Sequence, residues 1–163
     1  MKLWYEQPAS NWVEALPIGN GRLGAMIYGK TDSEIMSLNE DTLWSGYPRE
    51  LNPKNKRESF LQAMELAKSR KYHEAQALIE SELTSGWSQS YLPLGDLLLS
   101  MKHTGEVQGY TRSLDLSTAV ASVEYQVDGV NYKREIFALA PDNVIAIRLS
   151  ADKPEYQFHA KPG

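Results

Sequence analysis

The densest group of chemically versatile residues lies in one short stretch, residues 37–46 (SLNEDTLWSG). It carries an amide, two carboxylates, a hydroxyl and an indole within one segment of chain. Amides and carboxylates hydrogen-bond the hydroxyl groups of a sugar, and the flat face of an indole packs against a pyranose ring. We therefore predict a substrate-binding segment that contacts a carbohydrate through Asn39, Glu40, Thr42 and Trp44.

Two arrangements of this segment are open. In an extended chain Glu40, Thr42 and Trp44 share one face and present it to a ligand. Alternatively the segment is architectural: Asn39 or Asp41 caps backbone amides, and Trp44 fills the core. In either case neighbouring carboxylates in one loop do not form a glycosidase pair, which needs two carboxyl groups roughly 5–9 Å apart across the substrate. No catalytic residue is predicted in this segment.

Two other motifs suggest chemistry and do not support it. The run Gly19–Gly24 (GNGRLG) matches the nucleotide-binding spacing GxGxxG, but it precedes a predicted strand and lacks the helix N-terminus that would hold a pyrophosphate. We expect its Arg22 to form an ion pair with Asp41 or Glu40 instead. The histidines do not have the spacing of a metal site: His73, His103 and His159. The sequence therefore predicts neither a metal nor a cofactor.

Composition excludes several classes of protein. The 163 residues contain 17 Lys plus Arg against 21 Asp plus Glu, so no basic surplus is available for a nucleic-acid partner. The absence of cysteine excludes disulfides and thiolate chemistry. No apolar run approaches the roughly 20 residues of a membrane-spanning helix, so no membrane partner is expected. The N-terminus lacks a signal-like apolar stretch, which indicates a cytoplasmic protein, or a secreted one if a signal peptide has been removed.

The elements that would position the candidate segment are mostly strands. Residues 23–28 and 34–38 are predicted strands separated by a turn at 29–32. Residues 119–127 alternate apolar and polar side chains and end at Asp128-Gly129, the dipeptide typical of a type I′ hairpin turn. That turn places Val127 opposite Val130, Tyr125 opposite Tyr132, and Glu124 opposite Lys133. Residues 143–149 are apolar on both faces, which predicts a strand buried inside a sandwich, and a further strand is expected from Tyr156 onward.

One region breaks this pattern. Residues 52–84 show helical spacing in two segments, the first with Phe60 and Met64, the second with Ile79 and Leu83. Asn52-Pro53 resembles an N-cap followed by proline at the first helical position. We predict a helical hairpin that lies outside the sandwich and turns those four apolar residues inward.

A family resemblance covers nearly the whole chain. Its motifs follow one another in order: LWY (3–5), PA (8–9), W (12), EALPIGNGRLGAM (14–26), LNEDTLWSG (38–46), YLPLGDL (91–97), LDL (114–116), GVNYKRE (129–135) and APD (140–142). In this combination the chain resembles the N-terminal domain of glycoside hydrolase family 95, the family of inverting α-L-fucosidases and related enzymes.

The resemblance implies a mainly β fold: part of a two-sheet antiparallel supersandwich, with the helical hairpin inserted at about 52–84. Residues 1–163 would be one domain, the N-terminal portion of that sandwich. In the family an (α/α)6 barrel follows and carries the catalytic residues, so none can be assigned to this chain. The implied partners are a fucosylated or related oligosaccharide and the protein's own C-terminal barrel.

Three functional interpretations follow. The first is an accessory sandwich that braces the barrel and lends a loop to the substrate site. The second is a stand-alone carbohydrate-binding sandwich, and the third is a purely structural one. The length of the parent reading frame distinguishes the first from the second, and the resemblance favours the first.

Overall fold

The computed structural model describes residues 1–47, 54–84, 88–154 and 157–163. The chain forms two compact units. Residues 1–43 and 92–163 form a β-sandwich unit, and residues 44–91 form a helical unit. The mainly β fold with an inserted helical hairpin is confirmed.

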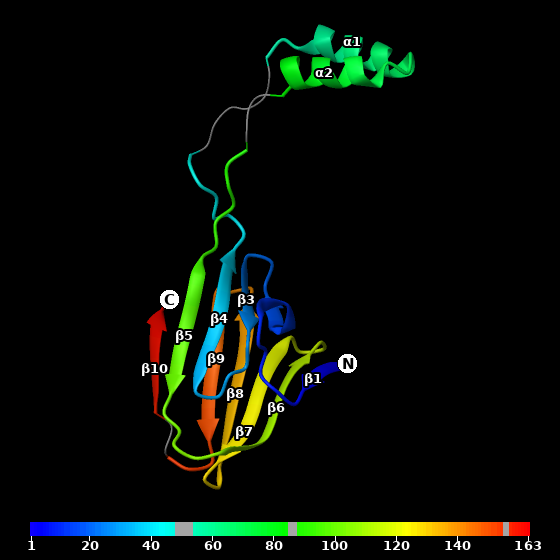
Figure 1. Ribbon diagram of the computed structural model, residues 1–163. Helices are drawn as coiled ribbons and strands as arrows, with labels where there is room; N and C mark the ends of the chain where they lie inside the picture. Colours follow the sequence, from blue (N-terminus) through cyan, green and yellow to red (C-terminus); the bar gives the residue numbers. More distant parts are fainter. Residues whose placement is uncertain (48–53, 85–87, 155–156) are drawn as a thin grey trace. The chain divides into compact units, whose positions relative to one another are not determined.

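The described residues of the sandwich unit form two antiparallel sheets of five strands each (Figure 1). One sheet, sheet A, has the strand order β1-β6-β7-β8-β9. Its strands are β1 (Lys2–Tyr5), β6 (Val107–Asp115), β7 (Val120–Val127), β8 (Val130–Leu139) and β9 (Val144–Ala151). The other, sheet B, has the order β10-β5-β4-β3-β2. Its strands are β2 (Leu16–Gly19), β3 (Leu23–Ile27), β4 (Ser33–Glu40), β5 (Gly95–Met101) and β10 (Phe158–Pro162), and a 3₁₀ turn, η1 (Trp12–Glu14), precedes β2.

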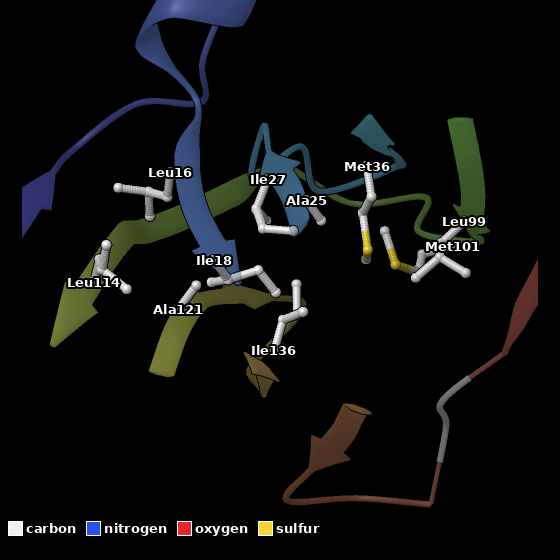
Figure 2. Packing of buried hydrophobic residues seen from close by; sticks show 10 residues of the cluster. All are labelled: Leu16, Ile18, Ala25, Ile27, Met36, Leu99, Met101, Leu114, Ala121 and Ile136. Atoms are coloured by element: carbon white, nitrogen blue, oxygen red, sulfur yellow. The ribbon is translucent and has the colours of Figure 1, made fainter. Parts of the chain in front are cut away.

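Alternating side chains from the two sheets meet in the core. Figure 2 shows the buried cluster to which Ile27 and Met36 of sheet B and Ala121 and Ile136 of sheet A belong. Each of these four side chains is fully buried. The period of two in each strand thus delivers one apolar face per sheet, and the two faces close on each other.

Charged residues also lie between the sheets. Arg134 of β8 and Glu34 of β4 form an ion pair in which both side chains are fully buried. Arg134 also donates to the carbonyl of Lys30 at 2.8 Å, and the Gly29 N–H donates to the Glu34 carboxylate at 2.8 Å. Because burying two charges costs several kcal/mol unless they are paired, this contact favours one pairing of the sheets over any other.

The predicted hairpin is confirmed in every pair. Val127 lies opposite Val130, Tyr125 opposite Tyr132, and Glu124 opposite Lys133. Asp128 and Gly129 have φ values of 52° and 73°, as a type I′ turn requires. The two tyrosine rings stack at 5.4 Å on the inner face, and the Lys133 Nζ lies 3.3 Å from Glu124 on the outer face.

The strand at 143–149 is present, but its predicted environment is wrong. It forms β9 at the edge of sheet A, next to β8 alone. Its inward side chains Ile145 and Ile147 are only partly buried, and Val144 is 43% exposed. An edge strand has a neighbour on one side only, so apolar residues on both faces do not guarantee burial. The following strand, β10, is described from Phe158, and Tyr156 lies outside the described residues.

The helical unit contains α1 (Arg57–Lys68) and α2 (Tyr72–Glu82), so the helical hairpin is confirmed. Helix α1 begins at Arg57 with Lys56 as its N-cap. The start expected at Asn52-Pro53 lies outside the described residues. No helix in the described part of the chain is long and apolar enough to cross a membrane.

The inward face predicted for the helices is wrong. Phe60 is 54% exposed, Met64 39% and Ile79 43%, and only Leu83 of the four predicted residues is half-buried. The buried positions are instead Ala63 and Ala75. The two helices pack against each other, and small residues allow this close approach. Phe60, Met64 and Ile79 are left on the surface of the unit.

Candidate functional site

The candidate segment begins at the end of β4, where the chain turns. Strand β4 ends at Glu40, and the Leu43 N–H donates to the Glu40 carbonyl at 3.2 Å, which closes a tight turn. The Glu40 carboxylate accepts hydrogen bonds from the Thr42 N–H at 2.9 Å and the Thr42 hydroxyl at 2.7 Å. Glu40 and Thr42 are therefore brought together by a turn, and the extended arrangement, one of the two left open for this segment, is wrong.

The neighbouring glycine-rich run holds the same carboxylate. The Arg22 Nε lies 2.8 Å from Glu40, so one of the two predicted ion pairs is confirmed. The Asp41 N–H donates to the Arg22 carbonyl at 3.0 Å. Asn20 shapes the run by accepting hydrogen bonds from the N–H groups of Arg22 and Leu23 at 3.0 and 2.7 Å.

These contacts set the charge of Glu40. The hydroxyl of Thr42 and then the guanidinium of Arg22 hold the pKa of the Glu40 carboxyl below its usual value. The same hydrogen bond raises the pKa of Arg22. Near neutral pH the pair is fully ionised. Glu40 therefore acts as a hydrogen-bond acceptor and has no proton to donate to a leaving group.

Arg22 was not among the residues predicted to bind a sugar, although its side chain lies beside Glu40 and reaches the solvent. Its side chain is 58% exposed, whereas that of Glu40 is 15% exposed. Within the described residues only its Nε is hydrogen-bonded, so its Nη groups are available to a ligand hydroxyl. Since the ion pair with Glu40 fixes the guanidinium, Arg22 belongs with the candidate residues.

The remaining candidates lie elsewhere. Asn39 is exposed on β4, one residue before Glu40 and thus on the opposite face of the sheet. Trp44 belongs to the helical unit, where it bridges to Tyr91 and meets that ring edge-to-face at 5.0 Å. Trp44 is 51% exposed. The alternative in which Trp44 fills the core is therefore wrong.

Similarity to known proteins agrees with this architecture. Residues 3–161 match the family described as glycosyl hydrolase family 65, N-terminal domain. The chain belongs to this family. The predicted resemblance to the N-terminal domain of a glycoside hydrolase is thereby confirmed, whereas membership of family 95 stays a prediction.

Curated relatives of this N-terminal domain are fucosidases by name. The chain is 43% identical over 158 residues to alpha-L-fucosidase 2 of Arabidopsis thaliana, covering 94% of this chain and 18% of the relative. It is 36% identical over 168 residues to probable alpha-fucosidase A of Aspergillus niger, covering 96% and 21%. A probable alpha-fucosidase A of Aspergillus oryzae is 29% identical over 158 residues, covering 91% and 21%. The chain thus spans about a fifth of the length of these relatives and corresponds to an accessory domain.

The partly buried histidine of this N-terminal domain, His103, packs against two tyrosines. His103 Nε2 lies 2.7 Å from the Tyr125 hydroxyl, and its ring meets that of Tyr132 at 4.6 Å. Burial lowers the pKa of His103. Within the described residues no group of three or more His, Asp or Glu side chains is placed to hold a metal ion.

Proposed function

We propose that the parent protein is an inverting α-L-fucosidase-like hydrolase of glycoside hydrolase family 95, acting on a fucosylated or related oligosaccharide. Its catalytic residues lie in a C-terminal (α/α)6 barrel outside residues 1–163. The β-sandwich braces that barrel, and the turn at Glu40 contributes to the substrate site. One observation carries the proposal: almost the whole chain aligns with about a fifth of proteins named as fucosidases.

The state of Glu40 supports a binding role over a catalytic one. The Thr42 and Arg22 contacts keep its carboxylate ionised and fixed in position. A fixed acceptor beside an exposed guanidinium suits the paired donor and acceptor character of neighbouring sugar hydroxyls. Asn39 and Trp44 remain part of the proposal as further sugar contacts, and Asn39→Ala and Trp44→Leu test each of them separately.

The test is kinetic and uses the intact parent enzyme. Glu40→Gln and Thr42→Val are expected to lower kcat/KM for a fucosylated oligosaccharide. The fall corresponds to a loss of roughly 1.5–3 kcal/mol of transition-state stabilisation, as for a lost hydrogen bond with a charged partner. Their melting temperatures stay close to that of the wild type, because both exchanges retain the side-chain size and an ion pair with the exposed Arg22 contributes about 1 kcal/mol or less. Asp41→Asn is the matched control, since it changes the neighbouring carboxylate, and it keeps the wild-type kcat/KM.

The opposite pattern contradicts the binding role. Unchanged kinetics together with a large loss of thermal stability in Glu40→Gln would mean that the turn is only architectural. The stereochemistry is tested separately by proton NMR during hydrolysis. An inverting enzyme releases β-L-fucose first from an α-L-fucoside, whereas α-L-fucose as the first product contradicts inversion.

A further inference from the structure

The outer face of sheet A contains a polar hollow away from the Glu40 turn. It spans strands β6 to β9 and has a volume of about 790 Å3. Ligand sites commonly fall within roughly 300–1,000 Å3. The side chains that rise from the outer face around it come from all four strands: Gln108, Thr111, Glu124, Gln126, Asn131, Lys133, Ser150 and Asp152.

A β-bulge in β6 builds one wall of this hollow. Gln108 pairs with Gln126 and Thr111 with Glu124, so the register shifts by an extra residue between them. The bulge lets Gln108 and Thr111 lie on the same face, although their spacing of three would otherwise place them on opposite faces. Gly109 within the bulge has a φ of 59°, and a Cβ built there meets no atom within 4 Å. No side chain of the described residues therefore packs against Gly109, and the space beside the bulge is open.

The bulge is anchored from the inside of the sandwich. The Tyr110 hydroxyl donates to the Gly29 carbonyl at 2.6 Å. Because this bond joins β6 to the turn before β4, the bulge is fixed by the opposite sheet. The shape of the hollow is therefore a property of the folded sandwich.

The opposite wall is a hydrogen-bonded chain of amides and a carboxylate. Gln126 Nε2 donates to Asn131 Oδ1 at 3.0 Å, and Asn131 Nδ2 donates to Asp152 at 2.6 Å. The Asn131 N–H donates to the other oxygen of Asp152 at 3.0 Å. These bonds orient the amides before any ligand arrives, which lowers the entropic cost of binding.

The charged groups of the hollow form one cluster around a lysine, with a further carboxylate at the rim. Lys133 Nζ lies 3.3 Å from Glu124 and 3.2 Å from Glu135, and Asp152 is exposed at the rim. Thr111 and Gln108 are exposed and make no side-chain hydrogen bond to the described residues. The hollow thus offers fixed acceptors, fixed donors and unengaged polar groups, and its carboxylates, Glu124 and Asp152, outnumber the Lys133 ammonium group.

We propose that this hollow binds a neutral oligosaccharide. A sugar chain carries hydroxyl groups that both donate and accept, which matches a lining of amides, hydroxyls, carboxylates and an ammonium group. A phosphate or another anion would need a cationic surplus that the Glu124–Lys133–Glu135 group does not leave. The inference rests on the proposed function, because a hydrolase of oligosaccharides works in the presence of such chains.

The test measures binding of lactose, a neutral disaccharide, to the intact parent protein by isothermal titration calorimetry. The double variant Thr111→Val, Lys133→Met removes a hydroxyl and an ammonium group from the hollow while retaining similar side-chain size. Its dissociation constant for lactose is expected to rise at least about tenfold, as for the loss of one or two hydrogen bonds. The matched control Thr118→Val, Lys102→Met makes the same exchanges at exposed positions outside the hollow, and it binds lactose as the wild type does.

Three results would overturn the proposal. One is the absence of saturable lactose binding by the wild type, and another is equal affinity in the hollow variant. The third is a loss of affinity accompanied by an equal fall in melting temperature relative to the control, which would mean that the face is buried against another part of the parent protein. Hydrolysis of an aryl α-L-fucoside is measured in the same preparations. If the wild type does not hydrolyse the fucoside, the proposed function is contradicted. The lactose measurement still tests binding in the hollow, because it does not depend on hydrolysis.

Discussion

Side chains on the inner faces of the sheets are not all apolar, and their position in the strand explains why. Glu34 precedes Met36 by two residues in β4, and Arg134 lies between Tyr132 and Ile136 at the same spacing in β8. The alternation that buries the apolar residues therefore buries these charges as well. Each charge is tolerated because the other neutralises it across the sandwich.

A partly buried histidine makes the stability of the sandwich depend on pH. Burial lowers the pKa of His103, against the opposing influence of Thr31 and Asp32. The unfolded chain then takes up a proton at a higher pH than the folded one. The stabilisation is complete above the ordinary value of 6.5 and is lost as the pH falls towards the lowered pKa of the folded state. We expect the melting temperature to fall on acidification from about pH 7.5 to about pH 5.

Two variants identify the group responsible for this pH dependence. His103→Gln removes the titration and is expected to flatten the pH dependence of the melting temperature, measured by circular dichroism. His73→Gln is the control, because His73 is exposed on α2. An identical slope in His103→Gln and the wild type would contradict this assignment.

At the residue scale the sequence predicted one side-chain contact correctly and left two others unpredicted. The Arg22–Glu40 pair was predicted because two oppositely charged residues flank adjacent predicted strands. The hydrogen bonds between Glu40 and Thr42 were not predicted. They form because the chain turns after Glu40, and the residue types alone did not show whether the chain turns or stays extended there. The Glu34–Arg134 pair was also missed, although strand alternation placed both charges inward. Only the packing of one sheet on the other shows which charge meets which.

At the element scale the β7–β8 hairpin depends on local backbone geometry. Gly129 has a φ of 73°, and a Cβ there would meet no atom within 4 Å, so any cost of substitution comes from the backbone alone. Gly129→Ala is expected to lower the free energy of unfolding by about 1–2 kcal/mol, and Gly129→Val by more, because side chains disfavour the left-handed region. The measurement is urea unfolding.

Gly24 provides a matched control for this hairpin. It lies in β3 without a positive φ, and a Cβ there meets its neighbours at ordinary contact distances of 3.5 and 3.9 Å. Gly24→Ala is therefore expected to change the unfolding free energy by less than about 0.5 kcal/mol. Equal losses in Gly24→Ala and Gly129→Ala would show that the turn geometry is not the cause.

The helical hairpin follows a different rule. Its helices were predicted from the spacing of apolar residues, but the prediction of which residues are buried was wrong. Spacing does not show which face of a helix packs against its neighbour. Ala63→Asp places a charge in the contact between α1 and α2 and is expected to cost about 1–3 kcal/mol of stability. Phe60→Lys is expected to change it by less than about 0.5 kcal/mol, because Phe60 is already exposed. Helical circular dichroism during thermal unfolding measures both, and a larger loss in Phe60→Lys contradicts the arrangement.

At the scale of the whole molecule, strand periodicity and one turn dipeptide were enough to predict a mainly β chain with a helical insertion. They did not predict which strands lie at the sheet edges, because edge positions follow from the order of pairing. The apolar strand β9 shows this most directly. Its composition matches a central strand, yet sheet A ends with it.

The last prediction is that residues 1–163, produced alone, do not hydrolyse an aryl α-L-fucoside. A general acid for glycoside cleavage needs a carboxyl group with a raised pKa within reach of the substrate. Among the described carboxyl groups whose pKa departs from its ordinary value, only Glu34 has a raised pKa, caused by burial. Its side chain is completely enclosed and paired with Arg134, so no sugar can reach it.

The other shifted carboxyl groups have lowered pKa values and retain their negative charge: Glu14, Glu40, Asp115 and Asp152. A fluorogenic α-L-fucoside assay compares the purified chain with a preparation from cells carrying the empty vector, and the intact parent enzyme is the positive control. Equal signals from the chain and the empty-vector preparation are expected. Turnover by the chain above that background, abolished by Glu40→Gln, would contradict the assignment of Glu40 as an acceptor and would place catalysis within the sandwich unit.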